Sequence, residues 1–310
     1  MGGRLRDGLP PSHDQVTPRA PSLGRDALSG RLERALLALQ EDRGPTAAWK
    51  RAWMLTALGQ YGSALKACAE AREGPATLQA CGLMTEAMLY RQVSLHDRAE
   101  DADATALSVL RNARVRPPSV RAAIRIGQVA DAVGLGMDQV VLLRRLQIAS
   151  AAVSAAGSWR QGVRLTWVRG EVLMARGAYT RASRVFAAGA MIASNQGARR
   201  HHAKSLIFLA ASRAASQDAS EARQMAERGL QLAAECGATP LMWPAELILA
   251  QVDAEASEAH LHRARELAEE VLNTLPQHLR VEVLQRPPAS WLLGEESSHT
   301  QGLAAAATDA

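Results

Sequence analysis

The order of apolar and polar residues along the chain predicts helices and no strands. Between residues 25 and 280, runs of Ala, Leu, Arg, Glu and Met are interrupted by Gly or Pro at intervals of about a dozen residues or more. The residues in these runs favour helices, and Gly and Pro mark the turns between them. No run alternates apolar and polar residues for long enough to indicate a strand. We therefore predict an all-α chain.

The two ends of the chain differ from the region between them. Residues 1–24 contain four prolines among Gly, Ser and Arg, which is typical of a disordered leader. Residues 281–310 contain a pair of prolines, Pro287 and Pro288, followed by a polar, Ala-rich stretch, so we expect a largely disordered tail with local docking by Trp291. The helical-repeat domain then spans residues 25–280. Its first segment predicts a helix that caps the first repeat.

A recurring motif divides this domain into units. The segments Gly59–Ala71 and Gly177–Gly189 share the pattern G-x-Y-x-x-A-x-x-x-(larger)-x-x-(small). The Gly permits the left-handed turn that ends a helix, and the small residues let two helices approach closely. This pattern resembles the tetratricopeptide repeat. In that family the Gly ends the first helix of a hairpin, helix A, and the aromatic residue opens the second, helix B.

Weaker copies of the motif lie between and after these two units. The anchor residues near the start of each helix B are Ala64, Ala99, Gln139, Ala182, Ala222 and Ala264. Their spacings are 35, 40, 43, 40 and 42 residues, longer than the family's unit of ~34. The resemblance implies a right-handed α-solenoid of about six antiparallel helical hairpins. A generic solenoid of helical hairpins without tetratricopeptide character is the alternative.

The resemblance also implies a binding function. In tetratricopeptide proteins the inner, concave surface of the A helices commonly binds peptides, and some members hold a terminal carboxylate there with Lys, Arg and Asn. The candidate partner-binding residues on this surface are Lys50, Arg91, Arg121, Arg125, Arg164, Trp167 and Lys204. The Asn residues of the carboxylate clamp have no equivalents here, which puts a true clamp in doubt. Cations scattered by chance in an Arg-rich chain are the alternative interpretation.

Four further residues fall on the same inner surface: Met84, Met88, Glu171 and Met174. A lining of Met and Trp adapts to an apolar peptide or helix. Packing between adjacent hairpins is the alternative for these side chains. We expect another protein as the partner, bound through a peptide or helix, and an acidic segment would match the cations.

Charge and cysteine content add little to this picture. The net charge is +5, and almost all of the cations are Arg because Lys occurs only at three positions. A chain rich in Arg and Ala and poor in Lys is typical of a high-GC bacterium, so codon bias supplies part of the basic balance. A nucleic-acid partner is left open by charge alone. The three cysteines form no C-x-x-C pair, which predicts a reducing, cytoplasmic location, and no stretch is apolar enough to predict a membrane span.

Motifs for catalysis or metal binding are absent from the sequence. His201 and His202 are adjacent, and neighbours on a helix point about 100° apart, so they cannot form a two-ligand face. With Arg199 and Arg200 before them, they predict a solvated helix start. The segment at 134–137, GLGM, follows a helical run and predicts an interhelical turn, not a dinucleotide loop. We therefore expect no enzyme activity, no cofactor and no metal.

Two functions remain. The first is a non-catalytic protein–protein interaction scaffold that binds a peptide or helix on the concave face. The alternative is a regulatory, transcription-associated module that acts with a DNA-binding, sigma or ATPase partner. Tetratricopeptide-like arrays in bacteria often sit beside such domains, and this chain has none of its own that the sequence reveals.

Overall fold

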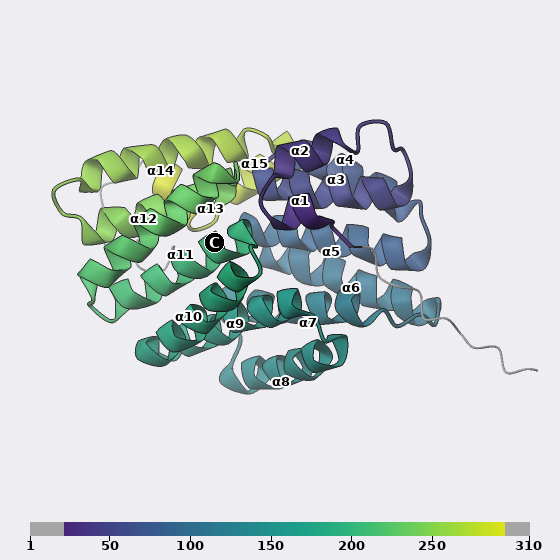
Figure 1. Ribbon diagram of the computed structural model, residues 1–310, viewed down its shortest axis with the longest axis horizontal. Helices are drawn as coiled ribbons and strands as arrows, with labels where there is room; N and C mark the ends of the chain where they lie inside the picture. Colours follow the sequence, from purple (N-terminus) through teal and green to yellow (C-terminus); the bar gives the residue numbers. More distant parts are fainter. Residues whose placement is uncertain (1–21, 295–310) are drawn as a thin grey trace, which may run out of the picture.

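The computed structural model describes residues 22–294, and this part of the chain consists of helices joined by short turns (Figure 1). Twelve of its helices pair into six consecutive hairpins. The A helices are α3 (Pro45–Leu58), α5 (Ala76–Gln92), α7 (Pro118–Gly134), α9 (Trp159–Met174), α11 (Arg199–Ala215) and α13 (Thr239–Val252). The B helices are α4 (Tyr61–Arg72), α6 (His96–Asn112), α8 (Gln139–Ala156), α10 (Tyr179–Asn195), α12 (Ala219–Glu235) and α14 (Ser257–Leu272). The predicted right-handed solenoid of six hairpins is confirmed.

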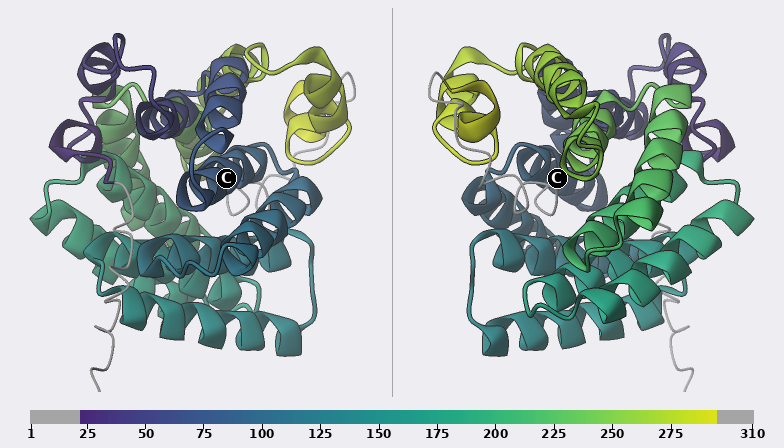
Figure 2. Two further views of the ribbon diagram at one scale, coloured as in Figure 1. Left: turned by 90° about the vertical axis from the view of Figure 1, so that its right-hand side faces the viewer. Right: turned by 90° about the vertical axis from the view of Figure 1, so that its left-hand side faces the viewer.

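The small anchor residues explain why the hairpins pack closely. Five of the six anchors are completely buried in B helices: Ala64, Ala99, Ala182, Ala222 and Ala264. Gln139 is instead the exposed first residue of α8. That helix buries only Leu142 and Ala149, and both views of Figure 2 show it along the outer edge of the molecule. The third hairpin is therefore the one that departs from the repeat pattern.

The turns between helices follow the sequence signals. Gly59 ends α3 at φ 82°, and Gly177 precedes α10 at φ 68°, as the motif requires. The predicted turn between α7 and α8 is confirmed, and Gly136 adopts φ 62° within it. Asp138 then caps α8, because its side chain accepts hydrogen bonds from two N–H groups in the first turn of α8, those of Val140 and Val141.

The superhelix closes on itself, so that the last hairpin contacts the first. Thr274 follows α14 and lies against the turn between α3 and α4. Its hydroxyl oxygen is 2.7 Å from the carbonyl oxygen of Gly59 and accepts a hydrogen bond from the N–H of Tyr61 at 3.0 Å. Its carbonyl accepts from the N–H of Gly62 at 2.9 Å. We call this set of bonds the ring contact.

Ion pairs strengthen the closure at a second place. Arg286, just after α15 (Gln277–Leu284), lies 2.7 Å from Asp97 of α6, and Glu282 of α15 lies 2.8 Å from Arg98. Figure 1 shows α15 beside the first hairpins. The segment that follows the last hairpin therefore contacts the second hairpin instead of lying at the far end of a rod.

The ends of the repeat domain differ in detail from expectation. The capping segment is two short helices, α1 (Arg25–Leu28) and α2 (Leu32–Leu37), because Gly30 interrupts it at φ 88°. The boundary predicted at residue 280 falls inside α15, and α16 (Ala289–Leu293) follows. Leu292 is buried against α14, whereas Trp291 is 43% exposed, so Leu292 makes the docking contact. Residues 1–21 of the leader and 295–310 of the tail lie outside the described chain.

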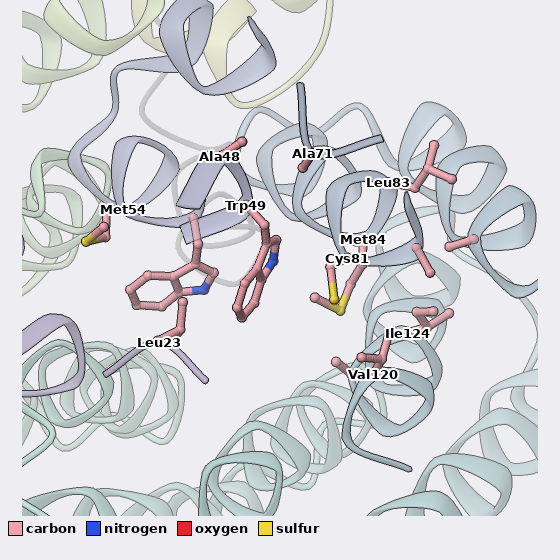
Figure 3. Close-up of a cluster of buried hydrophobic side chains, with 14 of the residues drawn as sticks. Leu23, Ala48, Trp49, Met54, Ala71, Cys81, Leu83, Met84, Val120 and Ile124 are labelled. Atoms are coloured by element: carbon pink, nitrogen blue, oxygen red, sulfur yellow. The ribbon is translucent and has the colours of Figure 1, made fainter. Parts of the chain in front are cut away.

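One hydrophobic cluster joins the first three hairpins. It runs from Leu23 through α3 and α5 to Val120 and Ile124 of α7 (Figure 3). Trp49 donates a hydrogen bond from Nε1 to the Thr85 hydroxyl at 3.2 Å, which ties α3 to α5. No helix within residues 22–294 has both the length and the apolar character needed to cross a bilayer.

Candidate ligand site inside the superhelix

A cavity of about 100 Å³ lies on the inner surface of the superhelix, between the A helices α5, α7, α9 and α11. One part of its wall is apolar and is formed by Met88, Ile126, Val133, Trp167, Val168 and Phe208. Another part is charged and is formed by Arg91, Arg164, Glu171, Arg200 and Lys204. The cavity therefore combines an apolar wall with a cationic end.

The structure brings four of the predicted site residues together at this cavity: Arg91, Arg164, Trp167 and Lys204. Lys50, Arg121 and Arg125 do not line it. Arg121 is exposed and lies about 120° around α7 from Gly127, which faces the cavity. Arg125 donates to the side-chain oxygen of Gln128 at 2.7 Å. The alignment of units treated Arg121 as equivalent to Arg164 and Lys204, but it is the fourth residue of its helix and they are the sixth, so it lies on a different side of the helix.

The Met residues and Trp167 take both of the roles considered for them. Met88 lines the cavity, whereas Met84 is buried in the first cluster and Met174 packs against the cluster around Phe186. Trp167 packs between hairpins, since its Nε1 donates to the Ser205 hydroxyl of α11 at 2.8 Å, and its ring also faces the cavity.

Arg91 is bound by buried carboxylates. Its Nη1 donates to Asp103 at 2.9 Å and to Asp131 at 2.7 Å, and both carboxylates are completely buried. The second oxygen of Asp131 lies 3.2 Å from Nδ1 of His96. This network joins α5, α6 and α7 behind the cavity. Arg91 therefore holds the wall in place, and its charge is compensated.

Asp103 gives the network a dependence on pH. Burial raises the pKa of Asp103 to about 7, although the positive charge of Arg91 opposes this shift. In the unfolded chain the carboxyl loses its proton near pH 4, so between about pH 4 and 7 the folded protein holds a proton that the unfolded chain has lost. Through that window this group makes the protein less stable as the pH rises.

Replacing the carboxyl of Asp103 by an amide tests this dependence. In the unmodified protein, Asp103 makes the free energy of unfolding fall as the pH rises, by up to about 1.4 kcal/mol per pH unit for one full proton. In Asp103→Asn we expect this contribution to be absent. Urea unfolding of both proteins at pH 5 and pH 7 measures the difference. An equal change of stability with pH in the two proteins would contradict the assignment.

Two arginines that sequence reasoning missed complete the cationic end. Arg160 and Arg200 are the second residues of α9 and α11, and Arg164 and Lys204 are the sixth. Arg160 is 40 residues before Arg200, and Arg164 is 40 residues before Lys204. The B-helix anchors of these two hairpins have the same spacing. That equal spacing is the signal from which Arg160 and Arg200 could have been found.

These arginines reach across the interior to the first hairpin. The guanidinium carbons of Arg160 and Arg200 lie 5.1 and 5.8 Å from the ring centroid of Trp53 in α3, within the range of cation–π contacts. His201 is also buried, and its ring stacks on Trp167 at 5.6 Å. The predicted solvated helix start is therefore wrong for Arg200 and His201, because tryptophans from other hairpins cover them.

The charge of the cationic end is only partly compensated. Within the described chain, no carboxylate lies within ion-pair distance of Arg160, Arg164 or Arg200. Burial lowers the pKa of Arg160 and Arg200 to about 10 and that of Arg164 to about 9, and neighbouring cations add to the shift for Arg160 and Arg164. Burial also lowers the pKa of Lys204 to about 8, with Glu171 opposing. Such groups are stabilised by a nearby anion.

Other chemistry finds no support among the described residues. No group of three or more His, Cys, Asp or Glu within residues 22–294 is arranged to hold a metal ion. Cys68, Cys81 and Cys236 are buried free thiols, and burial raises the pKa of Cys81 to about 12. A thiol held in this protonated form is a poor nucleophile. The arrangement is suited to binding.

Comparison with known proteins shows a similarity in the fold. No protein-family model matches the chain, and no curated protein matches its sequence. A solved structure described as Rap protein complexed with competence and sporulation factor has a TM-score of 0.55 to this chain at 16% identity, over 86% of this chain and 80% of that one. The chain therefore has a tetratricopeptide-like helical-repeat fold similar to that of Rap protein.

Proposed function

We propose that this protein is a non-catalytic binding module that holds a peptide or helix of another protein at the inner surface of its superhelix. The observation that carries the proposal is the cavity on the A helices, where an apolar wall adjoins Arg164 and Arg200, and within residues 22–294 neither arginine has a carboxylate at ion-pair distance. Binding sites of this kind combine apolar surface with a few polar groups that fix orientation. The similar fold of a Rap protein solved in complex with competence and sporulation factor supports the same use of the surface.

The wall of the cavity is suited to an amphipathic segment. Trp167 and Phe208 offer rigid aromatic surface, and Lys204 lies 5.5 and 5.1 Å from their ring centroids. Met88 adds a side chain that adapts to the shape of its neighbour. A segment with an apolar side chain beside an acidic group would contact both parts of the wall.

The position of the cations favours a protein segment over a nucleic acid. Arg164, Arg200 and Lys204 line a cavity of about 100 Å³ inside the superhelix. That volume admits a side chain or a chain end, not a duplex. Nucleic-acid binding relies instead on cations spread along a surface that follows the phosphate backbone.

Filling the cavity tests the proposal without changing its charge. Ala130 lines the cavity and is partly buried, so Ala130→Phe places a ring inside it. The tagged full chain and its variant are each used to capture proteins from a lysate of the native host. We expect the amount of partner captured by the variant, measured by quantitative mass spectrometry, to be lower by about tenfold or more, equivalent to about 1.4 kcal/mol of affinity. A captured protein is then purified and its binding to both forms measured by calorimetry.

The matched control is Ala155→Phe, at an exposed position on α8 outside the cavity. It adds the same ring and is expected to leave capture unchanged. Circular dichroism and thermal unfolding establish that both variants are folded. Equal binding of the purified partner to a folded Ala130→Phe protein and to the unmodified one would refute the use of this cavity.

A further inference from the structure

We infer that the cationic end of the cavity is an oxyanion site, in which Arg164 and Arg200, with Arg160 beside them, bind a carboxylate or phosphate group. This inference rests on the proposed function, because it names the chemical group that the same cavity accepts. It also gives the group a structural effect. The bound oxyanion holds α9 and α11 against Trp53 of the first hairpin.

The first argument is the state of Arg200. This side chain is only 6% exposed, and its Nε has no hydrogen-bond partner within the described chain. A guanidinium carries five N–H donors in a fixed plane that fits the two oxygens of a carboxylate or phosphate. A buried guanidinium with an unsatisfied donor on the wall of a cavity can donate a hydrogen bond to an acceptor bound in that cavity.

The second argument is the balance of charge. Asp103 and Asp131 are both bonded to Arg91, and Glu171 acts on Lys204. Among residues 22–294, Arg164 donates only to the neutral side chain of Gln161, at 3.0 Å. The guanidinium groups of Arg160, Arg164 and Arg200 are thus left without an anion in the part of the chain that the structure describes. Burying such charges without a partner is unfavourable, and a bound oxyanion removes that cost.

The third argument is position in the repeats. Arg160 and Arg200 are second residues of adjacent A helices, so the site adjoins the positive ends of two helix dipoles, which also favour an anion. One helical turn later, Arg164 and Lys204 repeat the arrangement. Cations therefore recur at equivalent positions of two neighbouring hairpins, and three of the four line the cavity.

The surroundings distinguish the two sources of the oxyanion. The apolar wall continues from the cationic end along α9 and α11 through Trp167, Val168 and Phe208. A carboxylate at the end or on a side chain of a polypeptide brings apolar groups that would cover this wall. A free phosphate ion would leave it bare. The structure therefore favours the polypeptide carboxylate.

The test is thermal unfolding of the full chain with different anions at equal ionic strength. The probes are sodium phosphate, a short acetylated peptide ending in Leu-Glu with a free carboxyl terminus, its C-terminal amide with Gln in place of Glu, and sodium chloride. We expect the acidic peptide to raise Tm in a saturable way, by roughly 5 °C at a hundredfold excess over Kd. Chloride and the neutral peptide should not. A shift with phosphate alone would assign the site to free phosphate, and no shift with any oxyanion would overturn the inference.

Substitution of Arg200 separates binding from a structural role. With Arg200→Met, the buried charge is lost, so we expect the Tm in chloride to stay the same or rise while the oxyanion shift disappears. Arg181→Met, at an exposed position on α10, should retain the shift. If Arg200→Met lowers the Tm and keeps the shift, the arginine is structural and the inference fails. Arg164→Gln provides a second variant, expected to weaken the shift by about tenfold in apparent Kd.

The result is independent of the test of the proposed function. Capture of a partner that is lost with Ala130→Phe but insensitive to Arg200→Met would retain the binding module and reject the oxyanion site. Loss of capture with both substitutions, together with the anion-dependent Tm, would support both.

Discussion

Asp131→Ala is expected to lower the free energy of unfolding by about 3–5 kcal/mol. The reason is that Asp131 is completely buried and binds two groups from other helices, Arg91 of α5 and His96 of α6. Its removal leaves Arg91 in the interior with Asp103 alone, and Asp103 is itself hard to ionise at that depth. Urea unfolding at pH 7, followed by circular dichroism, measures the effect.

Two further proteins make this result specific. Asp97→Ala also breaks an ion pair with an arginine, Arg286, but at the surface, so its cost should stay below about 1 kcal/mol. The double substitution Asp131→Leu with Arg91→Met removes both charges, and we expect it to recover a large part of the stability lost in Asp131→Ala. A loss for Asp131→Ala no larger than that for Asp97→Ala would mean that the buried network contributes little.

Phe186→Ala is expected to lower the free energy of unfolding by a comparable amount, about 3–5 kcal/mol. Phe186 is 1% exposed and stacks on Phe208 of the next hairpin with ring centroids 5.1 Å apart. It fits because Gly170, on the facing helix, has no side chain. A Cβ there would lie 2.1 Å from the Phe186 ring.

The pairing of Gly170 with Phe186 gives a second measurement of the same contact. Gly170→Ala should lower the free energy of unfolding by about 1–3 kcal/mol through overpacking. Combined with Phe186→Leu, its cost should be smaller, because the smaller side chain leaves room for the methyl group. Gly162→Ala, on the same helix but with nothing within 4 Å of the new Cβ, should instead be neutral or stabilise by up to about 1 kcal/mol. Strictly additive costs would contradict the proposed fit.

The hairpins could be predicted from sequence because their signals are local. Gly59 and Gly177 end helices, and small residues such as Ala182 recur at the points where helices cross, so short stretches suffice to reveal each unit. The closure of the superhelix could not be found in this way. It depends on Thr274, which bonds to residues more than 200 positions earlier in the chain.

The candidate site was partly predictable for the same reason. Alignment of the repeats placed Arg164 and Lys204 on the inner surface, and the structure brings both to the cavity. Arg200 was missed because residues at a helix start usually face solvent, and nothing local indicates that Trp53 from the first hairpin lies over it. Arg121 was misplaced because it is the fourth residue of α7, whereas Arg164 and Lys204 are the sixth residues of their helices, and a shift of two residues turns a side chain about 200° around a helix.

The ring contact has a consequence for how the array as a whole can change. In an open solenoid each hairpin depends only on its neighbours, so end hairpins can fray, be lost or be duplicated. Here Thr274 must meet the turn at Gly59, and one hairpin more or fewer would move these two groups apart. The number of repeats is therefore fixed by geometry, and the first and last hairpins are expected to melt together as one cooperative unit.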